Sequence, residues 1–351
     1  MTQIDESKPV LVTGGGGYIA SWVVKYLLEK GCTVRATVRD KSNTKKTGHL
    51  TSLPGAERLE LVEADLLDAS TFRAPMDGCE LVIHLASPFF VAGIKDPQKQ
   101  LVDPAVQGTR AVLETANEVS SVKRIVLTSS VASVMGDNAD ARKVKDGVLN
   151  EEHWNESSSL SHQPYPYSKV QAEKAAWEIA GAQSRWDLVV INPSFVLGPS
   201  LSKRLDSTST DFVKGMVDGR YPAVLDLTMG VVDVRDVAQA HVLAGFTPGA
   251  KGRNLITARM MSMMDMANAL REKFGKSMKI PGMVMPKFLG YIVGPFFGQS
   301  WKWVDLNVGV PFELDNGKGI RELGIKYRPA EETLVQAVEQ LIESGAVKVK
   351  G

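Results

Sequence analysis

Short apolar runs rich in β-branched residues alternate, along the first half of the chain, with longer segments whose apolar residues recur every three or four positions. The longer segments, of which Ala20–Glu29 and Asp103–Val119 are examples, predict helices that lie against a sheet. The alternation is typical of βαβ units, so it predicts an α/β fold with a Rossmann-type, doubly wound parallel sheet. The predicted strands are Val10–Thr13, Thr33–Val38, Leu59–Val62, Leu81–Leu85, Arg124–Thr128 and Leu188–Asn192.

The alternation weakens beyond Asn192-Pro193, where a second part of the chain begins. Ser200–Thr210 is rich in serine and threonine, and methionines crowd together from Met260 onward. Two later runs, Val231–Val234 and Asn254–Thr257, are expected to be strands that return to the first sheet, so the second part is a smaller C-terminal lobe interleaved with the first domain. We expect the first domain at residues 1–193 plus about 231–257 and the lobe at about 194–230 plus 258–351.

The composition is that of a folded globular protein, with 44% hydrophobic and 23% charged residues among 351. The 41 lysines and arginines nearly balance 40 acidic residues, so no net field would attract nucleic acid or an anionic membrane. Two cysteines are too few for a disulfide framework, and the N-terminus shows no export signal, so we expect a cytoplasmic protein. Lys287, prolines and glycines interrupt the apolar stretch Pro281–Val304, and no membrane span is predicted.

A glycine-rich segment, Thr13-Gly14-Gly15-Gly16-Gly17-Tyr18-Ile19-Ala20, joins the first predicted strand to a helical pattern. Glycines at such a junction let backbone N–H groups approach a pyrophosphate at the helix N-terminus. A plain tight turn uses the same residues, but a position in the first βα turn of an alternating chain favours a dinucleotide site. We expect Gly14 and Gly17 to make the phosphate approach, with Tyr18 and Ile19 as further cofactor-binding residues.

The end of the second predicted strand indicates which dinucleotide is bound. An NAD site usually has Asp or Glu there for the ribose 2′-hydroxyl, whereas this chain has Arg39-Asp40-Lys41 and then Lys45-Lys46. Cationic side chains suit the 2′-phosphate of NADP(H), so we interpret the site as one for NADP(H). The plain alternative is a solvated basic loop, and Asp40 leaves NAD open as the cofactor. Asp65, at the end of the third strand, either lies where adenine is held or caps a helix.

Tyr165 and Lys169 are four residues apart, so on a helix they share one face, and Pro166 suits the first turn of that helix. A nearby ammonium and a positive nicotinamide ring would favour the phenolate of a tyrosine, whose ordinary pKa is about 10, and make it usable in proton transfer. Ser130 follows a predicted strand at the sheet edge that faces the ligand crevice, and it could bind a substrate carbonyl. For both Ser129 and Ser130 the alternative is that the side chain caps a local turn, and for Ser129 this is our interpretation.

Several segments together, in order, resemble the extended short-chain dehydrogenases/reductases over nearly the whole chain. They are Thr13-Gly14-x-x-Gly17-x-x-Ala20, Thr128-Ser129-Ser130, Tyr165-x-x-x-Lys169, Asn192-Pro193 and Asp233-Val234-Arg235-Asp236-Val237-Ala238. Three more are similar to the branch of dihydroflavonol reductases, cinnamoyl-CoA reductases and methylglyoxal or aldehyde reductases: Val34–Asp40, His84-Leu85-Ala86-Ser87-Pro88-Phe89 and Ala175-Ala176-Trp177-Glu178.

This resemblance implies a set of site residues. It makes Ser130, Tyr165 and Lys169 the catalytic triad, and it places Arg39 and Lys46 on the 2′-phosphate. Further cofactor contacts are implied for Asp65 and Leu66 near adenine, and for Ala86, Ser87, Pro193 and Val196 along the cofactor. For Asp233, Arg235 and Asp236 we expect a salt bridge and a helix cap, and for His84 and His241 a structural role.

Three departures from the family pattern bear on the substrate. Gln107 replaces an asparagine associated with a proton-relay water, and Met135 replaces the asparagine with which dihydroflavonol reductases bind flavonoids. Around the catalytic tyrosine, Gln163-Pro164-Tyr165-Pro166-Tyr167 replaces the Asn-Trp-Tyr-Cys-Tyr of cinnamoyl-CoA reductases. A dihydroflavonol or cinnamoyl-CoA substrate is therefore disfavoured.

We expect an NADPH-dependent reductase of small apolar or aromatic aldehydes or ketones, with hydride from nicotinamide C4 and a proton from Tyr165. A hydroxysteroid dehydrogenase or a nucleotide-sugar epimerase on the same fold stays open, as does a non-catalytic dinucleotide-sensing regulator. The histidines lack paired ligand spacing, so no metal is expected, and the oligomeric state is open. We expect Met260–Met266 to be core, and Met283–Trp303, which prolines and glycines break into short pieces, to be a mobile cover over an apolar substrate.

Overall fold

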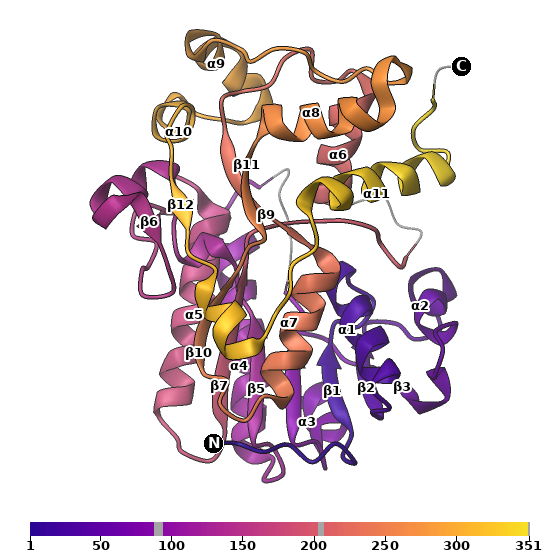
Figure 1. Ribbon diagram of the computed structural model, residues 1–351. Coiled ribbons are helices and arrows are strands. Elements are labelled where there is room, and N and C mark those ends of the chain that lie inside the picture. Colours follow the sequence, from indigo (N-terminus) through magenta and orange to yellow (C-terminus); the bar gives the residue numbers. More distant parts are fainter. Residues whose placement is uncertain (88–93, 203–206, 350–351) are drawn as a thin grey trace.

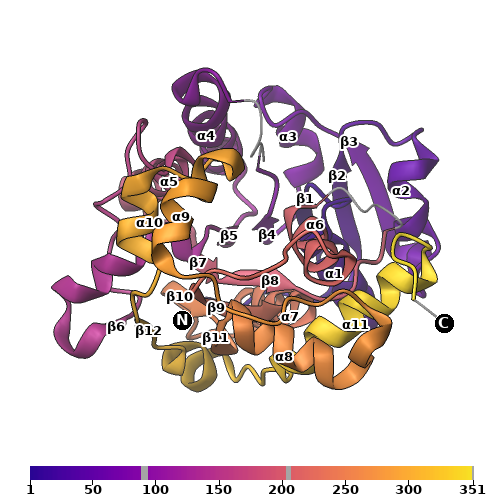
Figure 2. The same cartoon turned by 90° about the horizontal axis from the view of Figure 1, so that it is seen from above.

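A single parallel sheet forms the centre of the computed structural model, which describes residues 1–87, 94–202 and 207–349. Its order, β10-β7-β5-β4-β1-β2-β3, shows that the chain winds outward from β1 in both directions (Figures 1 and 2). This confirms the predicted α/β fold with a doubly wound, Rossmann-type sheet. The strands are β1 (Val10–Thr13), β2 (Val34–Val38), β3 (Leu59–Glu63), β4 (Leu81–His84), β5 (Arg124–Thr128), β7 (Asp187–Pro193) and β10 (Gly252–Ile256).

Helices cover both faces of this sheet because its strands are apolar on both sides. Val10 and Val12 of β1 pack into the same core as Leu27, whereas Leu11, which points to the opposite face, packs into a second core with Val112. Figure 2 shows the two layers of helices on either side of the strands. One layer contains α1 (Tyr18–Glu29) and α7 (Val234–Phe246), and the other contains α3 (Ser70–Met76), α4 (Asp103–Glu118) and α5 (Pro164–Gly181).

A smaller sheet, in the order β11-β9-β8, corrects one expectation from the sequence. Of the two strands expected to return to the central sheet, Asn254–Thr257 does so as part of β10, but Val231–Val234 does not. β9 (Thr228–Asp233) pairs instead with β8 (Phe195–Leu197) and, antiparallel, with β11 (Arg259–Ser262). The physical reason is that β8 follows β7 after Ser194 alone, and β10 takes the edge of the central sheet beside β7.

In the described part of the C-terminal half, five α-helices lie outside the central layers, and they are in the upper part of Figure 1. Three of them pack on the smaller sheet around one core, in which Met261 and Met266 are buried, as expected for this methionine cluster. The helices are α6 (Thr208–Asp218), α8 (Met263–Phe274), α9 (Lys287–Val293), α10 (Trp301–Asn307) and α11 (Ala330–Glu343). The short strands β6 (Val148–Leu149) and β12 (Glu313–Leu314) pair in parallel beside them, and α2 (Thr44–Thr51) lies between β2 and β3 in the chain.

Two further expectations can be compared with the fold. Asp233 caps α7 through the Arg235 backbone N–H, at 2.7 Å, and forms an ion pair with the Arg235 guanidinium at 2.6 Å, which confirms a structural role. No helix among the described residues is both long enough and apolar enough to cross a membrane. Pro88 and Phe89, which belong to one of the segments that resemble the reductases, lie outside the described residues.

Candidate active site

The glycine-rich turn lies where β1 passes into α1, and it is closely packed on both sides. Gly14 has a φ of +68°, and a Cβ atom there would lie 3.0 Å from Ala86 Cα at the end of β4. A Cβ atom on Gly15 would lie 2.8 Å from Ala36 Cβ on β2. Only glycines fit this turn, because one needs a left-handed conformation and both meet neighbouring strands. The turn therefore brings bare backbone to the carboxyl edge of the sheet, as a pyrophosphate site requires.

Helix α1 begins directly after this turn, and no side chain caps its first residues. The N-cap residue is Gly17, which has no side chain that could cap the helix. The N–H groups of Tyr18 and Ile19 therefore lie at an uncapped helix start that suits a phosphate. The Tyr18 side chain is engaged elsewhere, because its hydroxyl donates to the Gly198 carbonyl at 2.6 Å. Burial, the larger cause, together with the Asp233 charge raises the pKa of Tyr18, which therefore stays neutral.

Thr13 ties the ends of β1 and β4 together beneath the turn. Its hydroxyl oxygen accepts from the N–H groups of Leu85 and Ala86, at 3.1 and 3.0 Å, and lies 2.7 Å from His84 Nδ1. Burial, helped by the charge of Lys169, lowers the pKa of His84 to about 3, so the ring is neutral and Nδ1 accepts the threonine proton. The structural role expected for His84 fits this arrangement, which holds Ala86 against Gly14.

The residues after β2 differ in how far their charges are already satisfied. Arg39 and Lys46 are exposed, and a Cβ atom on Gly16 would lie 3.1 Å from the Lys46 carbonyl oxygen, so α2 begins beside the glycine turn. One oxygen of Asp40 accepts from the hydroxyl and the N–H of Ser42, at 2.6 and 2.9 Å. The Ser42 hydroxyl bond lowers the pKa of Asp40 most, so this carboxylate serves a local turn and the two cations remain available to an anion.

Beyond β3, the structure places Asp65 and Leu66 in a turn that faces α4. Asp65 accepts from the Leu67 N–H at 3.0 Å, which is local turn chemistry close to the capping alternative that the sequence left open. Leu66 lies on α4 so closely that a Cβ atom on Gly108 would come within 2.5 Å of its Cγ atom. Of the two side chains expected near adenine, Asp65 is therefore held within its own turn and Leu66 is packed against α4.

Ser130, Tyr165 and Lys169 come together at the carboxyl edge of the sheet. Tyr165 is in the first turn of α5, and its side chain forms a hydrogen bond with Ser130, which follows β5. The ammonium of Lys169 lies 5.8 Å from the centroid of the Tyr165 ring and donates to Ser87 Oγ at 3.2 Å. Four residues from three separate motifs, Ser87, Ser130, Tyr165 and Lys169, are thus in one cluster. Pro193, at the end of β7, pairs with Ile256, and Val196 lies on β8 beside Val232.

The ionisation of this cluster differs from the expectation for the tyrosine. Burial raises the pKa of Tyr165 to about 12, and the bond with Ser130 opposes this rise only in part. The expected lowering of the tyrosine pKa by a nearby ammonium is absent in the protein alone, because burial dominates and Lys169 is directed at Ser87. Burial also lowers the pKa of Lys169 to about 8, against the charge of Glu173.

Residues that the sequence reading missed lie directly behind this cluster. Glu173, fully buried on α5 one turn after Lys169, accepts from Ser129 Oγ and Ser133 Oγ, both at 2.5 Å. Arg253 of β10 donates to the same carboxylate at 2.6 Å. The assignment of Ser129 to local capping is therefore wrong. The available signal was an acidic residue spaced i+4 from Lys169 and i+8 from Tyr165, which places it on their helix face.

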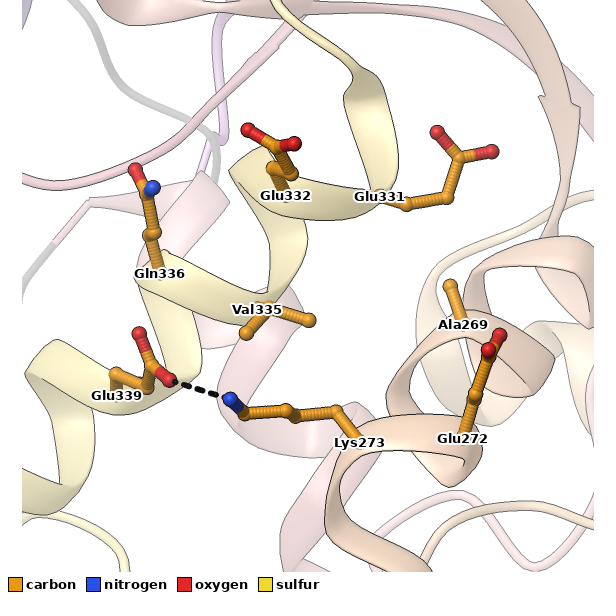
Figure 3. A pocket seen from close by; sticks show the side chains of 8 residues that line it. All are labelled: Ala269, Glu272, Lys273, Glu331, Glu332, Val335, Gln336 and Glu339. Atoms are coloured by element: carbon orange, nitrogen blue, oxygen red, sulfur yellow. Dashed lines mark ion pairs between the residues drawn. The ribbon is translucent and has the colours of Figure 1, made fainter.

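A groove of about 570 Å³ elsewhere on the protein lies between α8 and α11 (Figure 3). Four glutamates line it, and one of them, Glu339, forms an ion pair with Lys273 at 3.4 Å. None of the residues of the Tyr165 cluster lines this groove. Its acidic lining does not suit an anionic dinucleotide, so we assign cofactor and substrate to the edge of the sheet that carries the glycine turn and Tyr165.

The fold and this edge define a Rossmann-type dinucleotide-binding protein, and comparison with known proteins gives the family. The model of the NAD dependent epimerase/dehydratase family matches residues 10–254, and the chain belongs to this family. This agrees with the resemblance to extended short-chain dehydrogenases/reductases. This chain is 37% identical to a cinnamoyl-CoA reductase, CAD2, of Medicago truncatula, over 95% of each of the two chains. A tetraketide alpha-pyrone reductase of Arabidopsis thaliana is 34% identical over 97% of this chain and 98% of its own.

Solved structures give the same result. The yeast methylglyoxal/isovaleraldehyde reductase Gre2, in complex with NADPH, has a TM-score of 0.79 and 28% identity and covers 97% of this chain and 100% of its own. Gre2 of Candida albicans in complex with NADPH has a TM-score of 0.78 at 28% identity over 96% of this chain and 99% of its own. The chain is therefore an oxidoreductase of this family.

The low pKa of Lys169 leads to a first prediction about activity. If Tyr165 is the proton donor, the nearby Lys169 loses the charge that would support proton transfer as pH rises through about 8. We expect kcat/KM for reduction to fall above that pH, by up to about tenfold per unit. Lys169→Arg, whose guanidinium stays charged, should move the fall to higher pH if the variant retains activity. Profiles of initial rate from pH 6 to 10 test this, and a wild-type kcat/KM that is constant between pH 7 and 10 contradicts it.

Proposed function

We propose that the protein reduces an aldehyde or ketone to an alcohol with NADPH. The observation that carries the proposal is the cluster of Ser130, Tyr165 and Lys169 at the same sheet edge as the uncapped glycine turn. A bound, reduced nicotinamide supplies the hydride. A non-catalytic dinucleotide sensor would have no need for a tyrosine, a serine and an ammonium in one cluster, so this arrangement favours catalysis over the regulatory alternative.

The protein residues manage the proton and the developing charge on the substrate oxygen. Ser130 Oγ already accepts the Ala132 N–H at 3.1 Å, so its own proton can be donated to a carbonyl oxygen and polarise it. Tyr165, neutral in the protein because its pKa is raised to about 12, then gives its proton to that oxygen. Lys169 is directed at Ser87 in the protein alone, but its ammonium lies 5.8 Å from the centre of the tyrosine ring and would stabilise the phenolate once proton transfer forms it.

NADPH rather than NADH is supported by the charges around the turn after β2. Arg39 and Lys46 are exposed cations, and Lys46 begins its helix next to Gly16. Asp40, the acid that could bind a ribose 2′-hydroxyl, has one oxygen engaged by Ser42. Gly14, Gly17 and the N–H groups of Tyr18 and Ile19 would hold the pyrophosphate. Asp65, Leu66, Ala86, Ser87, Pro193 and Val196 remain proposed cofactor contacts.

An apolar substrate is supported by the segment 283–303, which we call the apolar cover. Phe296 is 85% exposed, Trp301 67% and Phe288 63%, so these side chains are open to an incoming apolar group. Prolines and glycines separate α9, the 3₁₀ turn Gly294–Phe297 and α10, as expected for a cover built from short pieces. Met135 is buried in an apolar cluster with Phe312, which leaves it unable to bind a flavonoid hydroxyl as asparagine would.

The second prediction concerns the proton donor. Tyr165→Phe removes only the hydroxyl, so kcat should fall by about 10² to 10⁴-fold while the Kd for NADPH stays within about twofold. Steady-state kinetics and cofactor fluorescence measure the two quantities. Tyr167→Phe, a matched change on the same helix turn, is the control and should keep near wild-type kcat. A Tyr165→Phe enzyme with more than about a tenth of wild-type kcat would require a different proton donor.

The third prediction concerns the cofactor. Wild type should prefer NADPH, and Arg39→Ala should lower kcat/KM for NADPH by about tenfold or more while leaving that for NADH almost unchanged, because only NADPH carries the 2′-phosphate. Lys276→Ala removes an equally exposed cation from the C-terminal lobe and serves as the control. Equal use of both cofactors by wild type would show that Arg39 has no such function.

The fourth prediction concerns the substrate. In a homologous series of aldehydes, each further methylene should raise kcat/KM by up to about fourfold, equivalent to about 0.8 kcal/mol, until the pocket is full. Phe296→Ser should flatten the series, whereas Ile320→Ser, an exposed apolar residue outside the cover, should not. The panel includes a cinnamoyl-CoA thioester, a steroid ketone and a nucleotide sugar. A clear preference for the thioester or the sugar, or a flat wild-type series, argues against an apolar aldehyde or ketone.

A further inference from the structure

A second buried carboxylate, that of Asp137, is hydrogen-bonded to the residues that lead into the helix of Tyr165. Asp137 is 1% exposed and accepts three side-chain hydrogen bonds. His162 Nε2 lies 2.7 Å from one oxygen, and Asn307 Nδ2 and Gln163 Nε2 donate to the other at 2.7 and 3.2 Å. Two of these donors immediately precede α5, whereas the third comes from the end of α10. A buried carboxylate needs such donors, so the three side chains are held to one point.

Gln163 has a backbone conformation that its side chain must maintain. Its φ and ψ are +59° and +56°, in the left-handed region that residues other than glycine rarely adopt. The side-chain amide donates to the Gly136 carbonyl at 2.8 Å as well as to Asp137. Gln163 is the N-cap of α5 and stands two residues before Tyr165. The direction in which α5 begins, and with it the direction of the tyrosine, therefore depends on this clamp.

Asn307 attaches the apolar cover to the same carboxylate. It is the last residue of α10, it is buried, and its amide nitrogen also bonds the Trp303 carbonyl at 2.9 Å. Its amide oxygen accepts the Asn138 N–H at 2.9 Å, one residue beyond Asp137. Trp301, at the other end of this seven-residue helix, is one of the exposed side chains of the apolar cover. A displacement of α10 by a substrate therefore acts on Asp137 through Asn307.

We propose that Asp137 is a positioning residue of the reaction. Its carboxylate links α10 of the apolar cover, through Asn307, to the left-handed Gln163 that aims Tyr165. Contact between an apolar substrate and the cover then seats the proton donor, so chemistry is fastest when the cover is engaged. The inference rests on the proposed function, because it takes Tyr165 as the proton donor.

The test is a double-mutant cycle on the holoenzyme with Gln163→Gly and Asn307→Ala. Glycine tolerates the left-handed conformation, so Gln163→Gly removes the clamp without adding strain. Each single variant should lower the single-turnover reduction rate of a long-chain aldehyde by about tenfold, with KM and the Kd for NADPH within about twofold. The double variant should be only about as slow as the slower single variant, because both act through Asp137. Asn316→Ala, which removes a bond from the C-terminal segment to the Thr257 carbonyl, is the matched control.

Three results would overturn the proposal. The first is a single-turnover rate of Gln163→Gly equal to that of wild type, which overturns it even if Asn307→Ala fails to fold. The second is an additive cycle, with about a hundredfold loss in the double variant, and the third is a loss confined to KM. Failure of this inference is separable from failure of the proposed function. If Tyr165→Phe is inactive while Gln163→Gly is as fast as wild type, only the positioning by Asp137 is wrong.

Discussion

The buried charge of Glu173 is the interaction on which the arrangement of the active site depends. A carboxylate closed to solvent is stable only when paired and hydrogen-bonded, and leaving one unpaired costs roughly 3 to 5 kcal/mol. The side chains that bond it come from α5 itself and from three parts of the central domain. They are Trp177 at 3.3 Å, Ser129 and Ser133 on either side of Ser130 at 2.5 Å each, Asn192 of β7 at 2.9 Å and Arg253 of β10 at 2.6 Å. Satisfying one charge thus sets where α5 lies relative to the strand ends.

The same carboxylate connects geometry with electrostatics. Lys169 is one helical turn from Glu173, and the negative charge opposes the loss of the lysine proton that burial favours. Arg253, the partner of Glu173, is itself held by the Glu151 carbonyl at 3.0 Å and lies 4.0 Å from the centre of the Trp154 ring. Because the arginine neutralises Glu173 within the protein, the lysine receives only part of that charge. The balance leaves the pKa of Lys169 at about 8.

Local sequence patterns were sufficient for the central sheet and for the cluster of Ser130, Tyr165 and Lys169. Strands buried on both faces are short apolar runs, and a glycine turn, a helical i, i+4 pair and a strand end are each visible in a few residues. The placement of β9 could not be predicted this way, because an apolar run does not indicate which strand it pairs with. Glu173 was missed for a related reason: its partners come from residues 129 to 253 and meet only once the strand order is known. The prediction for Ser129 was wrong because a serine that follows a strand usually caps its own turn, whereas this one bonds the buried Glu173.

The buried carboxylates of Glu173 and Asp137 constrain the helix that carries Tyr165 in different ways. Among the residues that the structure describes, Glu173 is bonded to parts of the central domain and to its own helix, so it fixes the middle of α5 to the sheet. Asp137 lies at the start of that helix and is bonded to α10, whose neighbours in the chain are short pieces separated by prolines and glycines. A helix anchored firmly at its middle and less firmly at its first turn can keep Lys169 and the cofactor edge constant while Tyr165 responds to the lobe. Under the proposed function, this division would let a chain that shares 37% of its residues with a cinnamoyl-CoA reductase act on another carbonyl. In that proposal the residues that transfer the proton lie on α5 and at the edge of the central sheet, whereas those that meet the substrate belong to segments that can change without disturbing the sheet.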